Sequence, residues 1–148
     1  MKTALTIVVA VLLANLTPAA SLTAASRTTS AAGTVKVTVH YKGKGKVDAS
    51  HKLWVWVFDT PNIGPGAMPL DQVALDKNDI EAVFDGVAAD RVWIAAAYDE
   101  SGGMTGDGPP PPGTPIGILA GSDGAPVAVM SGAKDTAVLT FDDSQRMP

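Results

Sequence analysis

The feature that most constrains this fold is a two-residue alternation of apolar and polar side chains. In residues 34–41, every second side chain is apolar: Val35, Val37, Val39 and Tyr41. Because successive side chains of a strand point to opposite faces, this pattern predicts a strand with one buried face and one solvent-exposed face. No helical period persists for more than a few residues, so the chain is predicted to be all β.

Further segments along the chain have strand character. Residues 53–59 and 91–98 are apolar on both faces, which is typical of central strands. The shorter candidates are residues 70–75, 80–85, 116–119, 126–130 and 135–142, of which 70–75 is the weakest. About seven short strands separated by turn residues predict an antiparallel β-sandwich, with a small barrel as the alternative.

The amino-terminal segment has the pattern of a secretory signal peptide. Lys2 supplies a basic start, and residues 4–16 form an apolar run broken only by Thr6 and Asn15. Small residues follow, as at a signal-peptidase site. The run is shorter than the roughly 20 apolar residues of a transmembrane helix, and no later segment is longer.

These features predict an exported protein of one domain. Residues 1–25 are a leader cleaved after Ala25, or somewhat later after Ala32, and an uncleaved anchor is the alternative. Residues 26–33 read as a flexible lead-in, and residues 34–148 as a single domain in the periplasm or outside the cell.

Composition excludes several classes of function. The chain has no cysteine, which excludes disulfides, thiolate metal sites and lipid attachment through cysteine. The formal net charge is −4, and all 15 acidic residues lie from Asp48 onward, which argues against nucleic-acid binding. The one basic cluster, Lys42, Lys44 and Lys46, is predicted to be a solvated turn.

Two motifs near the middle of the chain make its layout resemble a known class of domain. Phe-Asp-Gly-Val at 84–87 ends one predicted strand, and Val-Trp-Ile-Ala-Ala-Ala-Tyr-Asp at 92–99 forms the next. Over residues 33–107 this order resembles bacterial extracellular sandwiches of the transthyretin-like or carboxypeptidase-regulatory-like type. The resemblance implies a seven-stranded sandwich in a non-catalytic, accessory, adhesive or binding role.

The longest connection, residues 99–115, is rich in glycine, proline and acidic residues. Its carboxylates, Asp99, Glu100 and Asp107, are the oxygen ligands that calcium prefers, and its glycines free backbone carbonyls. The domains that the chain resembles often carry Asp-x-Asn-Gly-Asn-Gly here, whereas this chain has Asp-Glu-Ser-Gly-Gly. The sequence thus raises a calcium site as one hypothesis, and a solvated acidic loop as the other.

A second loop, residues 60–69, is shaped by three prolines and two glycines. If the weak strand at 70–75 forms, simple up-and-down alternation places this loop and loop 99–115 at opposite ends of the sandwich. If that strand does not form, the two loops share an end and could make one surface.

Three tryptophans form a further candidate site. Trp54 and Trp56 share a face of one strand, and Trp93 lies on another. Exposed and coplanar, they would make a platform for sugar rings; the alternative is core packing against Ala95 and Ala97.

No catalytic motif surrounds any serine or either histidine. The chain is therefore predicted to be an exported, non-catalytic binding or structural module with a protein or glycan partner. We expect no cofactor other than calcium, no membrane-spanning segment and no nucleic-acid partner. The alternatives are a carbohydrate-binding module that uses the tryptophans and a small hydrolase with an unrecognised site.

Overall fold

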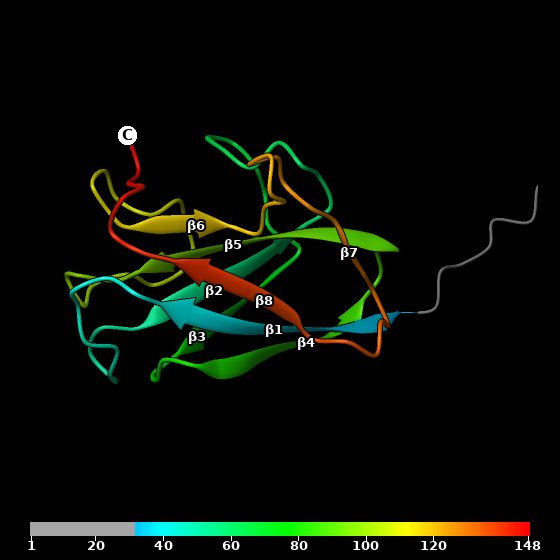
Figure 1. The fold of residues 1–148 in the computed structure, drawn as a ribbon, viewed down its shortest axis with the longest axis horizontal. Helices are drawn as coiled ribbons and strands as arrows, with labels where there is room; N and C mark the ends of the chain where they lie inside the picture. The colour runs from blue at the N-terminus through cyan, green and yellow to red at the C-terminus, as the bar shows by residue number, and fades with distance from the viewer. Residues whose placement is uncertain (1–31) are drawn as a thin grey trace, which may run out of the picture.

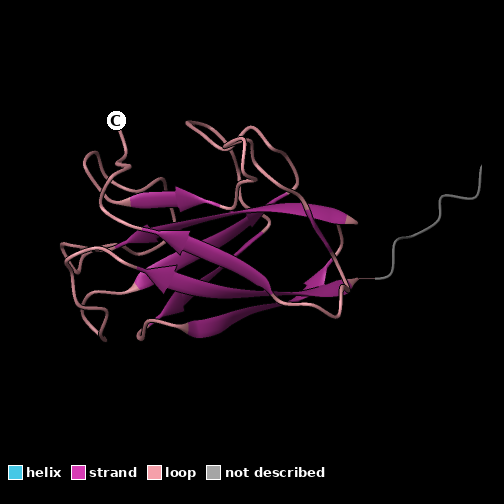
Figure 2. Cartoon of the chain, in the orientation of Figure 1, coloured by secondary structure: helices cyan, strands magenta, loops and turns pink. Residues whose placement is uncertain are grey.

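The computed structural model describes residues 32–148. The predicted signal peptide, residues 1–25, and all but the end of the predicted lead-in lie outside the described residues. Within residues 32–148 the chain forms eight strands and no helix. Figure 2 shows the loops and turns that join the strands. The described part accordingly contains no helix of the length and apolarity needed to cross a membrane.

The strands form two sheets that face one another as a β-sandwich (Figure 1). The three-stranded sheet has the order β4 (Ile80–Val87), β1 (Gly33–Tyr41), β8 (Ala137–Phe141). The five-stranded sheet has the order β3 (Asp71–Leu75), β2 (Leu53–Phe58), β5 (Arg91–Tyr98), β6 (Ile116–Ile118), and β7 (Val129–Met130) pairs with the start of β5. The predicted sandwich is confirmed, with the weak candidate at 70–75 present as β3.

The expectation of a purely antiparallel sandwich is wrong at one pair of strands. β8 runs parallel to β1, from Val37 opposite Ala137 to Tyr41 opposite Phe141. The chain leaves β7 beside the start of β1, where the backbone N–H of Gly132 donates to the carbonyl of Thr34 at 3.0 Å. β8 therefore begins at the same end as β1 and must run in the same direction.

The main core lies between the two sheets and follows the alternation in the sequence. The side chains Val35, Val37 and Val39 of β1 and Leu53, Val55 and Val57 of β2 are all buried. The largest fully buried side chain, Phe84 of β4, packs in the same cluster. Burial of these apolar surfaces is the main source of the stability of the domain, which has no disulfide.

The outer face of the five-stranded sheet is also apolar, which explains the double-faced pattern of β2 and β5. A second cluster forms there around Trp56, Phe58, Ala95 and Ala97. Ile63 and Ala67 pack against this cluster from loop 60–69, and Met104 packs against it from loop 99–115. Loops, rather than a third layer of secondary structure, cover this face.

Candidate functional site

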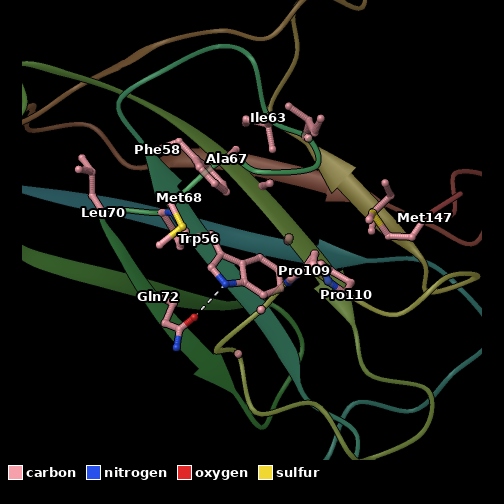
Figure 3. Close-up of a pocket in the computed structure, with 18 of the residues that line it drawn as sticks. Trp56, Phe58, Ile63, Ala67, Met68, Leu70, Gln72, Pro109, Pro110 and Met147 are labelled. Carbon is pink, nitrogen blue, oxygen red and sulfur yellow. Dashed lines mark hydrogen bonds between the residues drawn. The ribbon is translucent and has the colours of Figure 1, made fainter.

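An apolar pocket of about 530 Å³ lies on the outer face of the five-stranded sheet (Figure 3). Its floor is formed by strand residues of β2, β5 and β6: Trp56, Phe58, Ala95, Ile116 and Ile118. Its walls come from loop 60–69 with the start of β3, and from residues 106–110 of loop 99–115. We call this site the outer pocket.

Strand register explains why the floor is hollow. Ala95 lies opposite Trp56 on one side and opposite Ile118 on the other. A methyl group between two large side chains leaves a depression in the sheet surface. The small alanine of β5 between the large residues of β2 and β6 therefore shapes the site directly.

Trp56 is held in one position by its neighbours. Its indole Nε1 donates to Oε1 of Gln72, the residue opposite it on β3, at 2.9 Å. Its ring stacks on that of Trp54, with centroids 6.3 Å apart and planes 21° apart. Only 5% of Trp56 is exposed, so it is a fixed part of the pocket floor rather than a free platform.

Loop 60–69 folds back over the sheet and forms the first wall. The backbone N–H of Ala67 donates to the carbonyl of Gly64 at 2.9 Å, which closes a tight turn. The backbone N–H of Leu70 donates to the carbonyl of Val57 at 2.8 Å, which returns the chain to the sheet. Met68 remains 80% exposed at the rim, next to the half-exposed Leu70.

The start of loop 99–115 is organised by a buried carboxylate. Asp99 is only 3% exposed, and it accepts hydrogen bonds from the backbone N–H groups of Gly102 at 2.8 Å and Met104 at 2.9 Å. The backbone N–H and the hydroxyl of Ser101 also donate to it, at 3.2 and 2.9 Å. Burial alone would raise the pKa of Asp99, but these hydrogen bonds outweigh it and hold the pKa below its ordinary value.

Gly106 brings the same loop down onto the outer face. It has a φ of 83°, and a Cβ at this position would lie 2.2 Å from Cζ3 of Trp54. Only glycine tolerates both the left-handed backbone and so close an approach to the indole ring. Residues 106–110 can therefore reach the edge of the outer pocket.

The two loops leave the sheet at opposite ends, as the presence of β3 requires, yet they line the same pocket. Loop 60–69 follows the end of β2, and loop 99–115 follows the end of the antiparallel β5. Both fold over the outer face instead of projecting from the ends. The two loops therefore share one surface although they leave the sheet at opposite ends.

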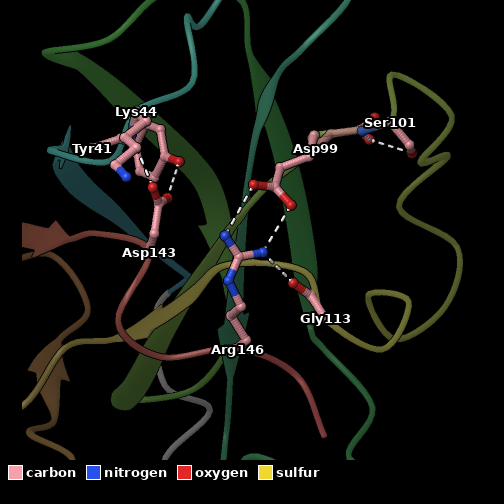
Figure 4. Close-up of polar contacts among 8 residues, drawn as sticks. Tyr41, Lys44, Asp99, Ser101, Gly113, Asp143 and Arg146 are labelled. Carbon is pink, nitrogen blue, oxygen red and sulfur yellow. Dashed lines mark hydrogen bonds and ion pairs between the residues drawn. The ribbon is translucent and has the colours of Figure 1, made fainter.

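The proposed calcium ligands are not brought together. The carboxylate of Asp99 already accepts hydrogen bonds from backbone N–H groups, and Glu100 forms an ion pair with Arg146 at 2.8 Å. Arg146 also donates to the carbonyl of Gly113, as Figure 4 shows. Asp107 lies apart, at the outer pocket, and residues 32–148 contain no group of three side chains of the kinds that bind metals. This arrangement does not support the calcium hypothesis.

The basic turn has a structural role that the sequence did not reveal. Its lysines are exposed, whereas Gly45 packs against the ring of Tyr98, where a Cβ would lie 2.2 Å from Cε1. Tyr98 stacks on Tyr41 with centroids 4.4 Å apart, and the Tyr41 hydroxyl donates to Asp143 (Figure 4). The pKa of Tyr41 is raised, chiefly by burial and next by the hydrogen bond to Asp143.

Of the three tryptophans singled out in the sequence, only Trp56 lines the outer pocket. Register places Trp54 and Trp93 on the same face of the sheet, opposite Ala97 and Phe58, but both lie beside the pocket rather than in it. Sequence reasoning missed Gln72, Ile116 and Ile118. The apolar character of both faces of β2 was the available signal that a second apolar surface exists.

Comparison with known proteins adds no further assignment. No protein-family model, curated protein or solved structure matches the chain. The function must therefore be argued from the site itself.

Proposed function

We propose that this chain is an exported, non-catalytic binding domain that holds a small apolar ligand in the outer pocket. The observation that carries the proposal is the pocket itself, which measures about 530 Å³ and is lined mainly by apolar side chains and glycines, with a few polar groups. Sites for small molecules usually measure about 300–1,000 Å³ and combine apolar walls with a few polar groups.

The lining residues favour binding over catalysis. Within the described part of the chain, the pocket presents no serine, threonine, cysteine, histidine, lysine or arginine side chain, and its two carboxylates, Asp71 and Asp107, come from different walls. The histidines lie elsewhere: His40 pairs with Asp79, and His51 lies 3.2 Å from Asp48. A hydrolase would need a nucleophile and a base within hydrogen-bonding reach of its substrate.

An apolar ligand also fits this site better than a sugar. A saccharide needs an open aromatic face surrounded by hydrogen-bonding groups. Here Trp56 is nearly buried, and its indole N–H donates a hydrogen bond to the side-chain amide oxygen of Gln72. Export is part of the proposal because of the basic start and apolar run of the leader.

The test uses naphthylmethanol, a neutral apolar probe small enough for the pocket. The three tryptophans give three indole N–H signals in a ¹⁵N–¹H spectrum, assigned by single Trp→Phe variants. We expect the probe to shift the Trp56 signal saturably and to leave the Trp93 signal in place. An oligosaccharide is titrated in parallel.

Ile63→Asp places a carboxylate on the pocket wall and should abolish the shift, because the charge would have to be desolvated beside the bound probe. Val127→Asp is the matched control, since Val127 is a loop residue outside the pocket and 42% exposed. The absence of any saturable shift, or equal loss of binding in both variants, would overturn the proposal. A shift of the Trp54 or Trp93 signal by the oligosaccharide alone would replace it with carbohydrate binding.

A further inference from the structure

The charged groups at the outer pocket are both negative. Among its lining residues, the charged side chains are Asp71, at the start of β3, and Asp107, in loop 99–115. They come from the two different walls, and both are exposed. No ion pair involves either residue within residues 32–148.

We propose that the ligand of the outer pocket is a small organic cation, an amine carried on an apolar body. This inference rests on the proposed function and names the chemical class of its ligand. The apolar body would lie on the floor formed by Trp56, Phe58 and Ala95. The ammonium group would lie at the rim, between the two carboxylates and in contact with water.

The floor holds the apolar body of such a ligand rather than its charge. Trp56 and Phe58 are adjacent along one face of β2, and both line the pocket. An apolar body can therefore pack against these side chains while its ammonium group stays at the rim, where a carboxylate would be repelled by Asp71 and Asp107.

The overall charge acts in the same direction. The chain carries 15 acidic and 11 basic residues, a formal net charge of −4. No lysine or arginine lines the pocket within the part of the chain that the structure describes. An anionic ligand would thus meet no compensating charge on entering the site.

The experiment compares three probes with the same naphthyl body. Naphthylmethylamine is cationic, naphthylmethanol is neutral, and naphthoic acid is anionic at neutral pH. Affinities are measured from the Trp56 indole signal at low salt. Exposed opposite charges attract one another modestly, so we expect the amine to bind about tenfold more tightly than the alcohol and the acid to bind most weakly. The ratio should shrink in high salt.

The Asp71→Asn/Asp107→Asn variant tests the source of this preference. Asparagine keeps an acceptor oxygen for the backbone N–H of Gln72, which donates to Asp71 at 2.7 Å. The ratio of amine to alcohol affinity should fall toward one in this variant. The matched control, Asp76→Asn/Asp135→Asn, loses the same two charges away from the pocket and should keep the ratio of the unmodified protein.

The outcomes separate this inference from the proposed function. If neither the alcohol nor the amine binds, the proposed function fails and this inference fails with it. If the alcohol binds and the amine binds equally or more weakly, the pocket is a binding site but the inference is overturned. The inference is also overturned if sedimentation shows dimers that Ile63→Asp dissociates, because the occupant is then a second copy of the chain.

Discussion

The most informative single change is Asp99→Ala, because it separates the two interpretations of the acidic loop. The side chain accepts hydrogen bonds from three backbone N–H groups and one hydroxyl. A hydrogen bond to a charged group contributes about 1.5–3 kcal/mol net to stability. Ser101 and Gly102 are exposed, so water would replace their share, whereas Met104 is half-buried.

We therefore count the loss as one to two charge-assisted hydrogen bonds, a destabilisation of about 2–4 kcal/mol. For a domain of this size, that change lowers Tm by roughly 10 °C. Urea unfolding followed by tryptophan fluorescence measures the free energy of unfolding, and thermal unfolding measures Tm. Asp99→Asn is the control, because it keeps one acceptor oxygen without the charge and should cost about half as much.

The pH dependence has a definite sign. The pKa of Asp99 is lower in the folded protein than in the unfolded chain, so its contribution to stability is present above the unfolded pKa. That contribution is lost as the pH falls through the folded pKa. The difference in stability between the unmodified protein and Asp99→Ala should be complete above about pH 5 and should shrink below about pH 4.

A destabilisation below about 0.5 kcal/mol, which is typical of surface substitutions, would refute the anchoring role of Asp99. Calcium provides the second check. We expect no change in Tm with millimolar calcium, because the carboxylates of Asp99, Glu100 and Asp107 are dispersed. A rise of several degrees that Asp99→Asn removes would establish the metal site instead.

Two further substitutions test the packing of the loop and of the core. Gly106→Ala forces a Cβ against Trp54 at a positive φ. It should lower the free energy of unfolding in urea by about 1–3 kcal/mol and weaken naphthylmethanol binding. At Gly108 a Cβ would meet nothing within 4 Å, so Gly108→Ala should change the free energy of unfolding by less than about 0.5 kcal/mol. Phe84→Ala removes the largest fully buried side chain and should lower the free energy of unfolding by about 3–5 kcal/mol in the same assay. The neighbouring Val83 is 41% exposed, so Val83→Ala should cost less than about 1 kcal/mol. Similar losses at both positions would contradict the assignment of the inner face of β4.

The amino-acid sequence determined the fold class and the positions of the strands. Alternation placed the strand at 91–98 correctly and the first two strands to within one residue at either end. Even the weak candidate at 70–75 formed β3. These properties are local, because the preference of a segment for the strand conformation and the side on which each residue lies depend on its own side chains.

The tertiary structure decided everything that depends on partners distant in the sequence. Alternation cannot say which strands pair, so the parallel pairing of β1 with β8 was not predictable from it. It also cannot say which face of the doubly apolar β2 meets the other sheet and which carries Trp56 into a pocket. The residues next to Asp99 in the sequence fit both a calcium site and a solvated loop. Only the folded loop turns the carboxylate of Asp99 toward backbone N–H groups. The outer pocket exists because two loops from opposite ends of one sheet fold over the same face, and such a meeting arises from packing rather than from local preference.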